Sequence, residues 1–205
     1  FANTNLVNCA ARDASLAHAL SSFLIFNDGI GLSLAAQLFR KTSFPDNLNG
    51  TDFSLALLRA LPEKTKVFLF GTYNDVLTKA KAILEIRTGI QVVGMLNGYS
   101  NLPDTDIVAR INASKADVVL VATGNPRQEH WIAANREALK SPLAVGVGAF
   151  LDFTAGKFMR APSWVQAIKC EWLFRLAQEP SRLIRRYSID LIEFFYNVAT
   201  TRPPD

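Results

Sequence analysis

The chain has 205 residues, of which 49% are hydrophobic and 20% charged, and its formal net charge is +4. This length suits one well-packed domain with a small appendage, and this composition excludes a disordered polymer. No apolar run approaches the roughly 18 residues of a membrane-spanning helix, and nothing near residue 1 is typical of a signal peptide. The two cysteines lack a metal-binding spacing, which favours free thiols in a reducing cytoplasm.

Short apolar runs alternate with helical patterns along the first 150 residues. We expect buried strands at 23–26, 66–71, 90–96, 117–124 and 143–151. We expect helices at 30–39, 52–61, 75–88, 105–114 and 128–139. Continuous apolar strands separated by helices are typical of a parallel sheet that is covered by helices on both faces. The sequence therefore predicts an α/β fold with a Rossmann-like parallel sheet, in a domain over residues 1–155.

The pattern after Asp152 is helical, basic and aromatic. We expect residues 156–205 to form a helical, basic C-terminal appendage. From Lys157 onward, eight basic and five acidic residues supply +3 of the net charge of +4, which favours an anionic partner. Arg182, Arg185 and Arg186 accompany an apolar stripe from Ile184 to Val198. This pattern is typical of a helix on an anionic bilayer, and equally of a helix packed on the core with solvated arginines.

Small, amide and carboxylate residues follow the predicted strands. In open α/β sheets, ligands bind at the carboxyl ends of the strands, where such turns gather. The turns supply these residues: Asp28, Gly71, Asn97, Tyr99, Gly124 and Asp152. The sequence therefore predicts a small-molecule site at this edge of the sheet.

The turn after the fourth predicted strand contains Gly124, Pro126 and Gln128 in the sequence “GNPRQ”. Glycine lets the backbone approach a ligand closely, and proline presets φ for the first turn of a helix. The N-terminus of that helix attracts phosphate, and Gln128 is placed to offer its amide to a phosphate oxygen or a sugar hydroxyl. An ordinary turn with a solvated glutamine explains the same residues.

Asp28 follows a predicted strand and precedes Gly29. A carboxylate there suits a general base, or an N-cap for the helix that is predicted from residue 30. The residue pattern alone favours the cap.

Asp104 and Asp106 form the Asp-x-Asp pattern with which many sugar transferases hold a divalent metal. The pattern also follows Pro103 and directly precedes a predicted helix, so helix capping explains it fully. His18 and His130 lack a third metal ligand. We therefore expect no metal site, no cofactor and metal-independent activity. The sequence contains no G-x-G-x-x-G, P-loop or G-x-S-x-G motif.

Six stretches cover nearly the whole chain, in this order: “NDGIGLSLAAQLF”, “NGTDF”, “VVGMLNGYS”, “GNPRQEHWI”, “VGVGAFLDFTAGKFMRAPSW” and “EWLFRLAQEPSRLIRRY”. Together they resemble the WecG/TagA/CpsF family of bacterial glycosyltransferases. The resemblance implies inverting transfer of a sugar from a UDP-sugar to a sugar on undecaprenyl diphosphate, for cell-surface or exopolysaccharide synthesis. UDP-glucose or a UDP-N-acetylhexosamine is the expected donor. The resemblance also implies a peripheral enzyme on the cytoplasmic membrane surface, with no nucleic-acid partner, and it leaves room for a homo-oligomer.

The resemblance also assigns roles to individual residues. Asp28 matches the proposed catalytic base, and Asn3 matches an active-site asparagine. Tyr99 and Asp152 match positions that line a uracil pocket, and Gln128 matches a motif glutamine. The matching basic residues of the appendage, which we expect to be catalytic, are Arg175, Arg182 and Arg185. The expected substrate-binding set is completed by Asn47, which stands where the family commonly has arginine, and by Gly71, Asn97, Gly124 and Gly148.

Two rival interpretations stay open at this point. One is a UDP-sugar-binding module of the same fold without catalysis. The other is a nicotinamide-dependent oxidoreductase on a Rossmann-like sheet, against which the missing G-x-G-x-x-G motif counts. Titration with UDP and with NAD separates the two.

Overall fold

The computed structural model describes residues 1–162, 165 and 171–201. Its internal contacts divide the chain into two compact units. The sheet unit comprises Gly50–Phe158, and the helical unit comprises Phe1–Asn49 together with Met159–Asp205. Residues 1–49, which we had grouped with the sheet, thus associate with the C-terminal helices.

The sheet unit is built on four parallel strands in the order β2-β1-β3-β4. The strands are β1 (Lys66–Gly71), β2 (Gln91–Asn97), β3 (Val118–Ala122) and β4 (Leu143–Gly146). The predicted strands at 66–71, 90–96 and 117–124 are confirmed. The apolar run 143–151 is a strand only as far as Gly146, because Gly148 turns the chain with a φ of +53° and a helix begins at Phe150.

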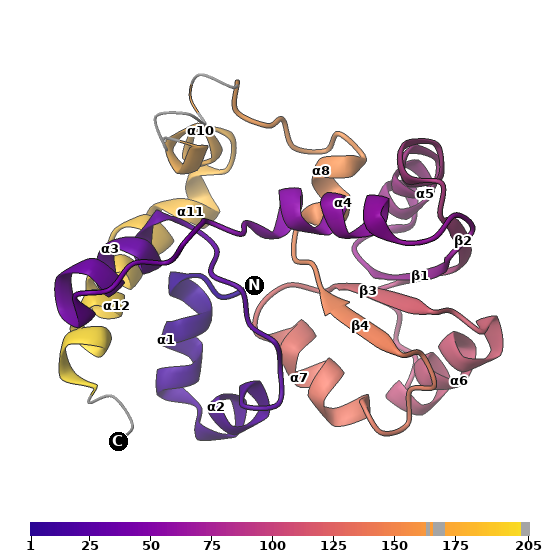
Figure 1. Ribbon diagram of the computed structural model, residues 1–205, viewed down its shortest axis with the longest axis horizontal. Helices are drawn as coiled ribbons and strands as arrows, with labels where there is room; N and C mark the ends of the chain where they lie inside the picture. Colours follow the sequence, from indigo (N-terminus) through magenta and orange to yellow (C-terminus); the bar gives the residue numbers. More distant parts are fainter. Residues whose placement is uncertain (163–164, 166–170, 202–205) are drawn as a thin grey trace. The chain divides into compact units, whose positions relative to one another are not determined.

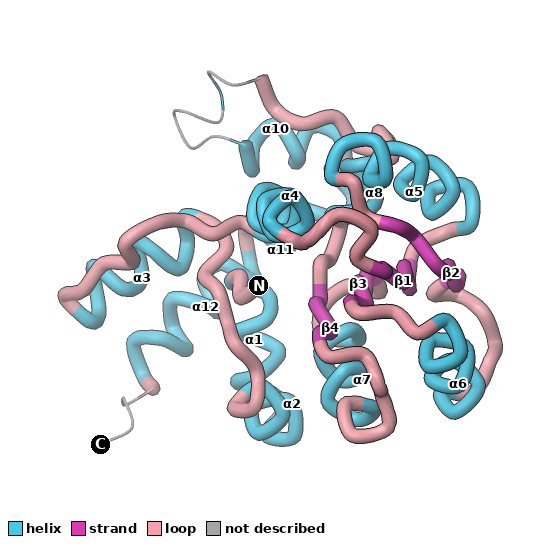
Figure 2. Tube along the Cα trace, turned by 45° about the vertical axis from the view of Figure 1, so that its right-hand side comes forward, coloured by secondary structure: helices cyan, strands magenta, loops and turns pink. Residues whose placement is uncertain are grey.

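Helices cover both faces of this sheet, which confirms the predicted α/β class (Figures 1 and 2). The helices α4, α5 and α8 lie on one face, and α6 and α7 lie on the other. Their bounds are α4 (Gly50–Ala60), α5 (Asn74–Thr88), α6 (Asp104–Ser114), α7 (Arg127–Asn135) and α8 (Phe150–Thr154).

The core lies where β1 and β3 meet the helices. All five residues of β3 are buried, and Leu58, Leu77 and Phe150 reach the same cluster from α4, α5 and α8. Each fully buried aliphatic or aromatic side chain contributes about 1.5–3 kcal/mol of transfer free energy.

The strand order creates a switch point in the middle of the sheet. The chain passes from β1 to β2 on one side and then crosses β1 to place β3 on its other side. The carboxyl ends of β1 and β3 therefore flank a crevice of the kind in which doubly wound folds bind ligands.

The helical unit contains six helices among its described residues. They are α1 (Thr4–Arg12), α2 (Ala14–Leu20), α3 (Ile30–Arg40), α10 (Glu171–Gln178), α11 (Pro180–Tyr187) and α12 (Ile189–Thr200). Buried Asn8 of α1 donates to the Asp190 carbonyl at 2.7 Å, and Arg12 pairs with Glu193 of α12. The Arg40 guanidinium caps the end of α12 by donating to the carbonyls of Val198 and Thr201. These contacts explain why the two ends of the chain form one unit.

The predicted strand at 23–26 is wrong. Asn27 makes one isolated parallel bridge to Ala2, and residues 23–26 pair with no strand of the sheet. Leu24 is 82% exposed, so this apolar run lacks the burial that a sheet strand requires. Among the described residues, no helix combines the length and the apolarity needed to cross a membrane.

We expect the ion pair between α1 and α12 to make stability depend on pH. The hydrogen bond from Arg12 holds the pKa of Glu193 below its ordinary value of 4.5. A lowered pKa stabilises the fold above pH 4.5, and this contribution is lost as the pH falls through the folded-state pKa. Thermal melts should therefore show a lower Tm for Glu193→Gln than for the parent at pH 7, with the gap closing as the pH falls through the folded-state pKa of Glu193. A gap of equal size at pH 7 and in acid contradicts this origin.

Candidate active site

The turns that follow β1, β2 and β3 pack closely together, and two glycines allow this approach. A Cβ on Gly71, which has a φ of +138°, lies only 2.4 Å from the Ala122 carbonyl carbon. A Cβ on Gly98 lies 2.7 Å from the Gly71 Cα. Thr72 donates its N–H to the Ala122 carbonyl, and the Gly98 N–H donates to the Thr72 carbonyl. The ends of β1, β2 and β3 are thus joined into one edge that only small residues fit.

Thr72, which follows β1, connects this edge of the sheet to α8. It has a φ of +34°, an uncommon conformation for a β-branched residue, and it is buried. Its hydroxyl donates to Asp152 Oδ1 at 2.9 Å, and the Lys157 ammonium donates to the same oxygen at 2.9 Å. Asp152, a predicted site residue, is therefore oriented by two donors.

Two tyrosines stack beside this carboxylate. The rings of Tyr73 and Tyr99 lie 4.5 Å apart with an interplanar angle of 20°, and both side chains are about half exposed. Predicted Asn97 positions the stack, because its Oδ1 accepts the Tyr99 N–H at 2.7 Å. The Lys157 nitrogen lies 5.2 Å from the Tyr73 ring centroid. This arrangement offers an aromatic platform with a cation and a carboxylate beside it.

The Lys157 ammonium is held in its charged form. Partial burial lowers its pKa, but the hydrogen bond and charge of Asp152, together with Tyr99 and Tyr73, raise the pKa above its ordinary value overall. Lys157 is therefore a permanent positive charge at the edge at neutral pH.

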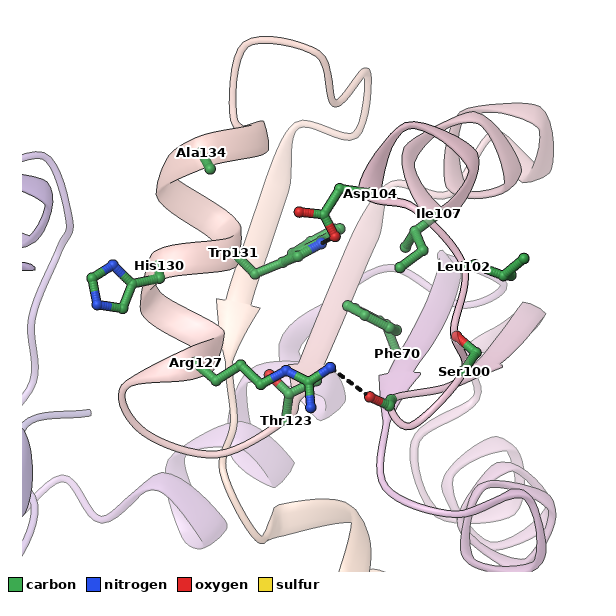
Figure 3. Close-up of a pocket in the computed structure, with 11 residues that line it drawn as sticks. Phe70, Ser100, Leu102, Asp104, Ile107, Thr123, Arg127, His130, Trp131 and Ala134 are labelled. Carbon is green, nitrogen blue, oxygen red and sulfur yellow. Dashed lines mark hydrogen bonds between the residues drawn. The ribbon is translucent and has the colours of Figure 1, made fainter.

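A pocket of about 290 Å³ opens between α6 and α7 on the other side of Gly98 (Figure 3). Arg127 lies at its mouth and donates to the Gly98 carbonyl at 2.8 Å. The buried hydroxyls of Ser100 and Thr123 line the pocket without a hydrogen-bond partner in the part of the chain that the structure describes. Unpaired buried hydroxyls beside a guanidinium favour a polar ligand, because a ligand oxygen can satisfy all three groups.

Trp131 anchors α7 against the sheet. Its ring packs 4.8 Å from that of Phe70, and its Nε1 donates to Asp104 Oδ1 at 3.0 Å. The expected capping role of Asp104 and Asp106 is wrong. Pro103 is the N-cap residue of α6 and no side chain caps that helix, since Asp104 lies in its first turn and binds Trp131 instead.

Gln128 is buried, whereas the sequence analysis expects its amide to contact a ligand directly. Its side chain is 1% exposed, and both ends of its amide are used inside the protein. The amide oxygen accepts the Gly148 N–H at 3.0 Å, and the amide nitrogen donates to Glu129 Oε1 at 2.8 Å. Gln128 therefore fixes the turn after β4. Gly124, with a φ of +82°, supplies the left-handed conformation of its own turn, which glycine adopts most readily.

The helical unit brings together three predicted residues that are far apart in the sequence. The Asp28 N–H donates to the Ala2 carbonyl at 2.7 Å, which places half-buried Asp28 next to Asn3. The Gly29 N–H donates to Asn47 Oδ1 at 2.8 Å. Asn3 caps α1, whereas Gly29 rather than Asp28 is the N-cap residue of α3. The alternative interpretation of Asp28 as a helix cap is therefore wrong.

The predicted arginines lie on the C-terminal helices. Arg175 is a half-buried residue of α10, and the largely exposed Arg185 of α11 lies 3.7 Å from Asp190. Arg182 belongs to α11, but its side chain lies outside the described part.

No three His, Cys, Asp or Glu side chains come together as a metal-binding group within the described ranges. Metal independence stays a prediction.

Sequence reasoning missed Tyr73, Arg127 and Lys157. Tyr73 follows the turn Gly71-Thr72, so the rule that strand ends bind ligands already pointed to its neighbourhood. No sequence pattern pointed to Lys157, because it does not follow a strand and only the fold places it beside Asp152.

The sheet order and this edge define a doubly wound α/β protein with a polar, aromatic edge at its switch point. A family model described as “Glycosyl transferase WecG/TagA/CpsF family” matches residues 1–204, and the chain belongs to that family. Membership implies glycosyltransferase activity in cell-surface polymer synthesis, with a sugar donor and a sugar acceptor as substrates.

Proposed function

We propose that this protein transfers a hexosyl group from a UDP-sugar to a sugar carried on undecaprenyl diphosphate, with inversion at the anomeric carbon. The observation that carries the proposal is the stack of Tyr73 on Tyr99 with Lys157 and Asp152 beside it. A pyrimidine ring stacks on an aromatic face, and a carboxylate accepts hydrogen bonds from a uracil N–H or ribose hydroxyls. UDP-glucose or a UDP-N-acetylhexosamine is the proposed donor.

The diphosphate needs cations and hydrogen-bond donors, and the same edge provides them. Lys157 and Arg127 carry positive charge there, and the Ser100 and Thr123 hydroxyls lack partners among the described residues. The N-terminus of α7 adds a partial positive charge. These groups can bind the donor and stabilise the charge that develops on UDP as it leaves.

The reaction is a direct displacement. Asp28 takes the proton of the acceptor hydroxyl, whose oxygen attacks the anomeric carbon as the bond to UDP breaks. The family resemblance supports this role for Asp28 and a role for Asn3 in the same step. Arg175, Arg182 and Arg185 are proposed to stabilise the departing UDP.

Docking on the cytoplasmic face of the membrane is proposed for the C-terminal helices. Ile189, Ile192 and Tyr196 form an exposed apolar face of α12, and Ile184 is exposed on α11 beside Arg185. Apolar side chains bordered by arginines suit the interface of an anionic bilayer, where each cation contributes about 1 kcal/mol.

Titration calorimetry with UDP and with NAD tests the nucleotide site. We expect UDP to bind and NAD not to bind. Tyr99→Ala should weaken UDP binding by about tenfold, since aromatic stacking contributes about 0.5–1.5 kcal/mol beyond the area that it buries. Tyr196→Ala, which removes an exposed tyrosine from α12, is the control and should leave UDP affinity unchanged. Binding of NAD in place of UDP favours the oxidoreductase instead.

Transfer should persist in EDTA. The cations proposed for the leaving group are side chains, so a chelator removes none of them. The initial rate with and without EDTA, measured after dialysis against chelator, checks this. Loss of activity that manganese or magnesium restores contradicts the metal-independent mechanism.

A further inference from the structure

We propose that Glu129 is a positioning residue that holds two substrate-facing turns of the sheet edge in register; this inference rests on the proposed function. Glu129 lies in the first turn of α7 and is 4% exposed. The Asn125 amide nitrogen lies 2.5 Å from its Oε1, and the Gln128 amide nitrogen lies 2.8 Å from the same oxygen. One buried carboxylate oxygen thus accepts two side-chain amides.

The first of these amides controls the turn after β3. Asn125 lies between Gly124, whose φ is +82°, and Pro126, the residue that precedes α7. Its side-chain bond to Glu129 ties this turn to the first turn of the helix. The turn is therefore held from within the protein, without a contact to a ligand.

The second amide controls the turn after β4. The Gly148 N–H is a donor only, so the Gln128 atom that faces it at 3.0 Å must be the amide oxygen. The amide nitrogen then points at Glu129, which as a carboxylate only accepts. Glu129 therefore fixes the orientation of the Gln128 amide, and Gln128 in turn fixes Gly148.

The environment of Glu129 excludes direct chemistry. Its Oε1 is occupied by two donors, and its Oε2 is buried without a partner among the described residues. A carboxylate that is shielded in this way cannot reach a substrate proton. In this role Glu129 needs only a hydrogen-bond acceptor of the right size. A catalytic carboxylate, by contrast, would also need its charge.

Substitution of Glu129 by glutamine and by alanine should have opposite effects on the two hydrogen bonds. Glu129→Gln keeps an oxygen that can accept from both amides, and its new amide nitrogen takes the place of the unpartnered Oε2. Glu129→Ala removes the oxygen that accepts from both amides. Glu137→Ala is the matched control, because it removes an exposed carboxylate that follows α7.

Side-chain amide signals in ¹⁵N–¹H spectra test the network without any substrate. In the parent protein, the Gln128 and Asn125 amide protons should exchange slowly with solvent, because each amide is hydrogen-bonded to a buried oxygen. We expect Glu129→Gln and Glu137→Ala to preserve this protection and Glu129→Ala to abolish it. Unchanged protection in Glu129→Ala overturns the network, whether or not the protein proves to be a UDP-sugar transferase.

Turnover then separates positioning from a merely structural role. Glu129→Ala should lower kcat by about 100-fold per folded molecule, the scale on which small misplacements of reacting groups act, with little change in UDP affinity. Glu129→Gln should restore kcat to within a few-fold and keep the parent's pH–rate profile. A normal kcat in folded Glu129→Ala, or a Glu129→Gln variant as slow as Glu129→Ala, overturns the proposal. Failure of the parent itself to release UDP counts against the proposed function instead.

Discussion

Replacing Asp28 by Asn is expected to lower turnover by roughly two to four orders of magnitude, the scale of general-base catalysis. Asn keeps the size and shape of the side chain but cannot take the proton of the acceptor hydroxyl. The affinity for UDP should stay largely intact, because the substitution leaves the tyrosine stack, Lys157 and Arg127 of the sheet unit unchanged. Rates of UDP release at saturating donor, together with calorimetric titration of UDP, measure both quantities.

Asp46→Asn is the matched control for Asp28→Asn. Asp46 is an exposed residue of the same unit, and its Oδ1 accepts the Asn47 N–H, which an asparagine oxygen can also do. This variant should turn over like the parent. Near-normal turnover of Asp28→Asn rules out Asp28 as the base, whereas equal losses in both variants point to a structural disturbance around Asn47.

The second large effect is expected from the C-terminal arginines. A charge that stabilises the departing UDP contributes about 10²–10³-fold to the rate. At least one of Arg175→Ala, Arg182→Ala and Arg185→Ala should lose turnover on this scale with a short, soluble acceptor. A membrane-free assay is essential, because it removes any effect of the arginines on docking.

Arg110→Ala, which removes an exposed arginine of α6, is the control for these variants and should be fully active. If all three C-terminal variants turn over the soluble acceptor like the parent, the arginines act only at the membrane. Each variant should then modestly weaken binding to anionic vesicles, and salt should weaken that binding further. The UDP charge would in that case be neutralised by Lys157 and Arg127.

Hydrophobic pattern was sufficient to predict β1 and β3 because these central strands are buried on both faces. The run 66–71 is continuous and apolar after Lys66, and every residue from Val67 to Gly71 is buried. The run 23–26 is also continuous and apolar, but it does not form a strand of the sheet. Four apolar residues are too few to show a periodicity that would identify the element against which they pack. Only tertiary pairing decides that residues 23–26 lie outside the sheet and are partly exposed.

Two N-terminal helices were missed although their capping signals are present. Asn3 and Asp13 cap α1 and α2 through hydrogen bonds to Leu6 and to Ser15 and Leu16. The helices are short and mixed in polarity, so their apolar spacing is weak. Their stability comes from packing of α1 against α12 and of α2 against α1, which a local pattern does not contain.

The candidate site was predictable in outline and not in its contacts. The rule that ligands bind at strand ends predicted Gly71, Asn97 and Asp152, and the structure brings these residues to one edge of the sheet. It could not show that Gln128 is buried, because the acceptor and donor that occupy its amide come from Glu129 and from Gly148, twenty residues further on. It also could not place Lys157 beside Asp152, a contact that depends on how the chain turns after α8.

UDP-dependent sugar transfer can be measured directly in one reaction. Purified protein is mixed with a set of UDP-sugars and a short-chain lipid-diphosphate-sugar acceptor, and UDP release and the mass of the acceptor are followed together. We expect that one UDP-sugar releases UDP only when acceptor is present, and that the acceptor gains the mass of one hexosyl or N-acetylhexosaminyl residue. Tight UDP binding with no mass gain from any donor in the set would contradict it and would favour a sugar-nucleotide-binding module without catalysis.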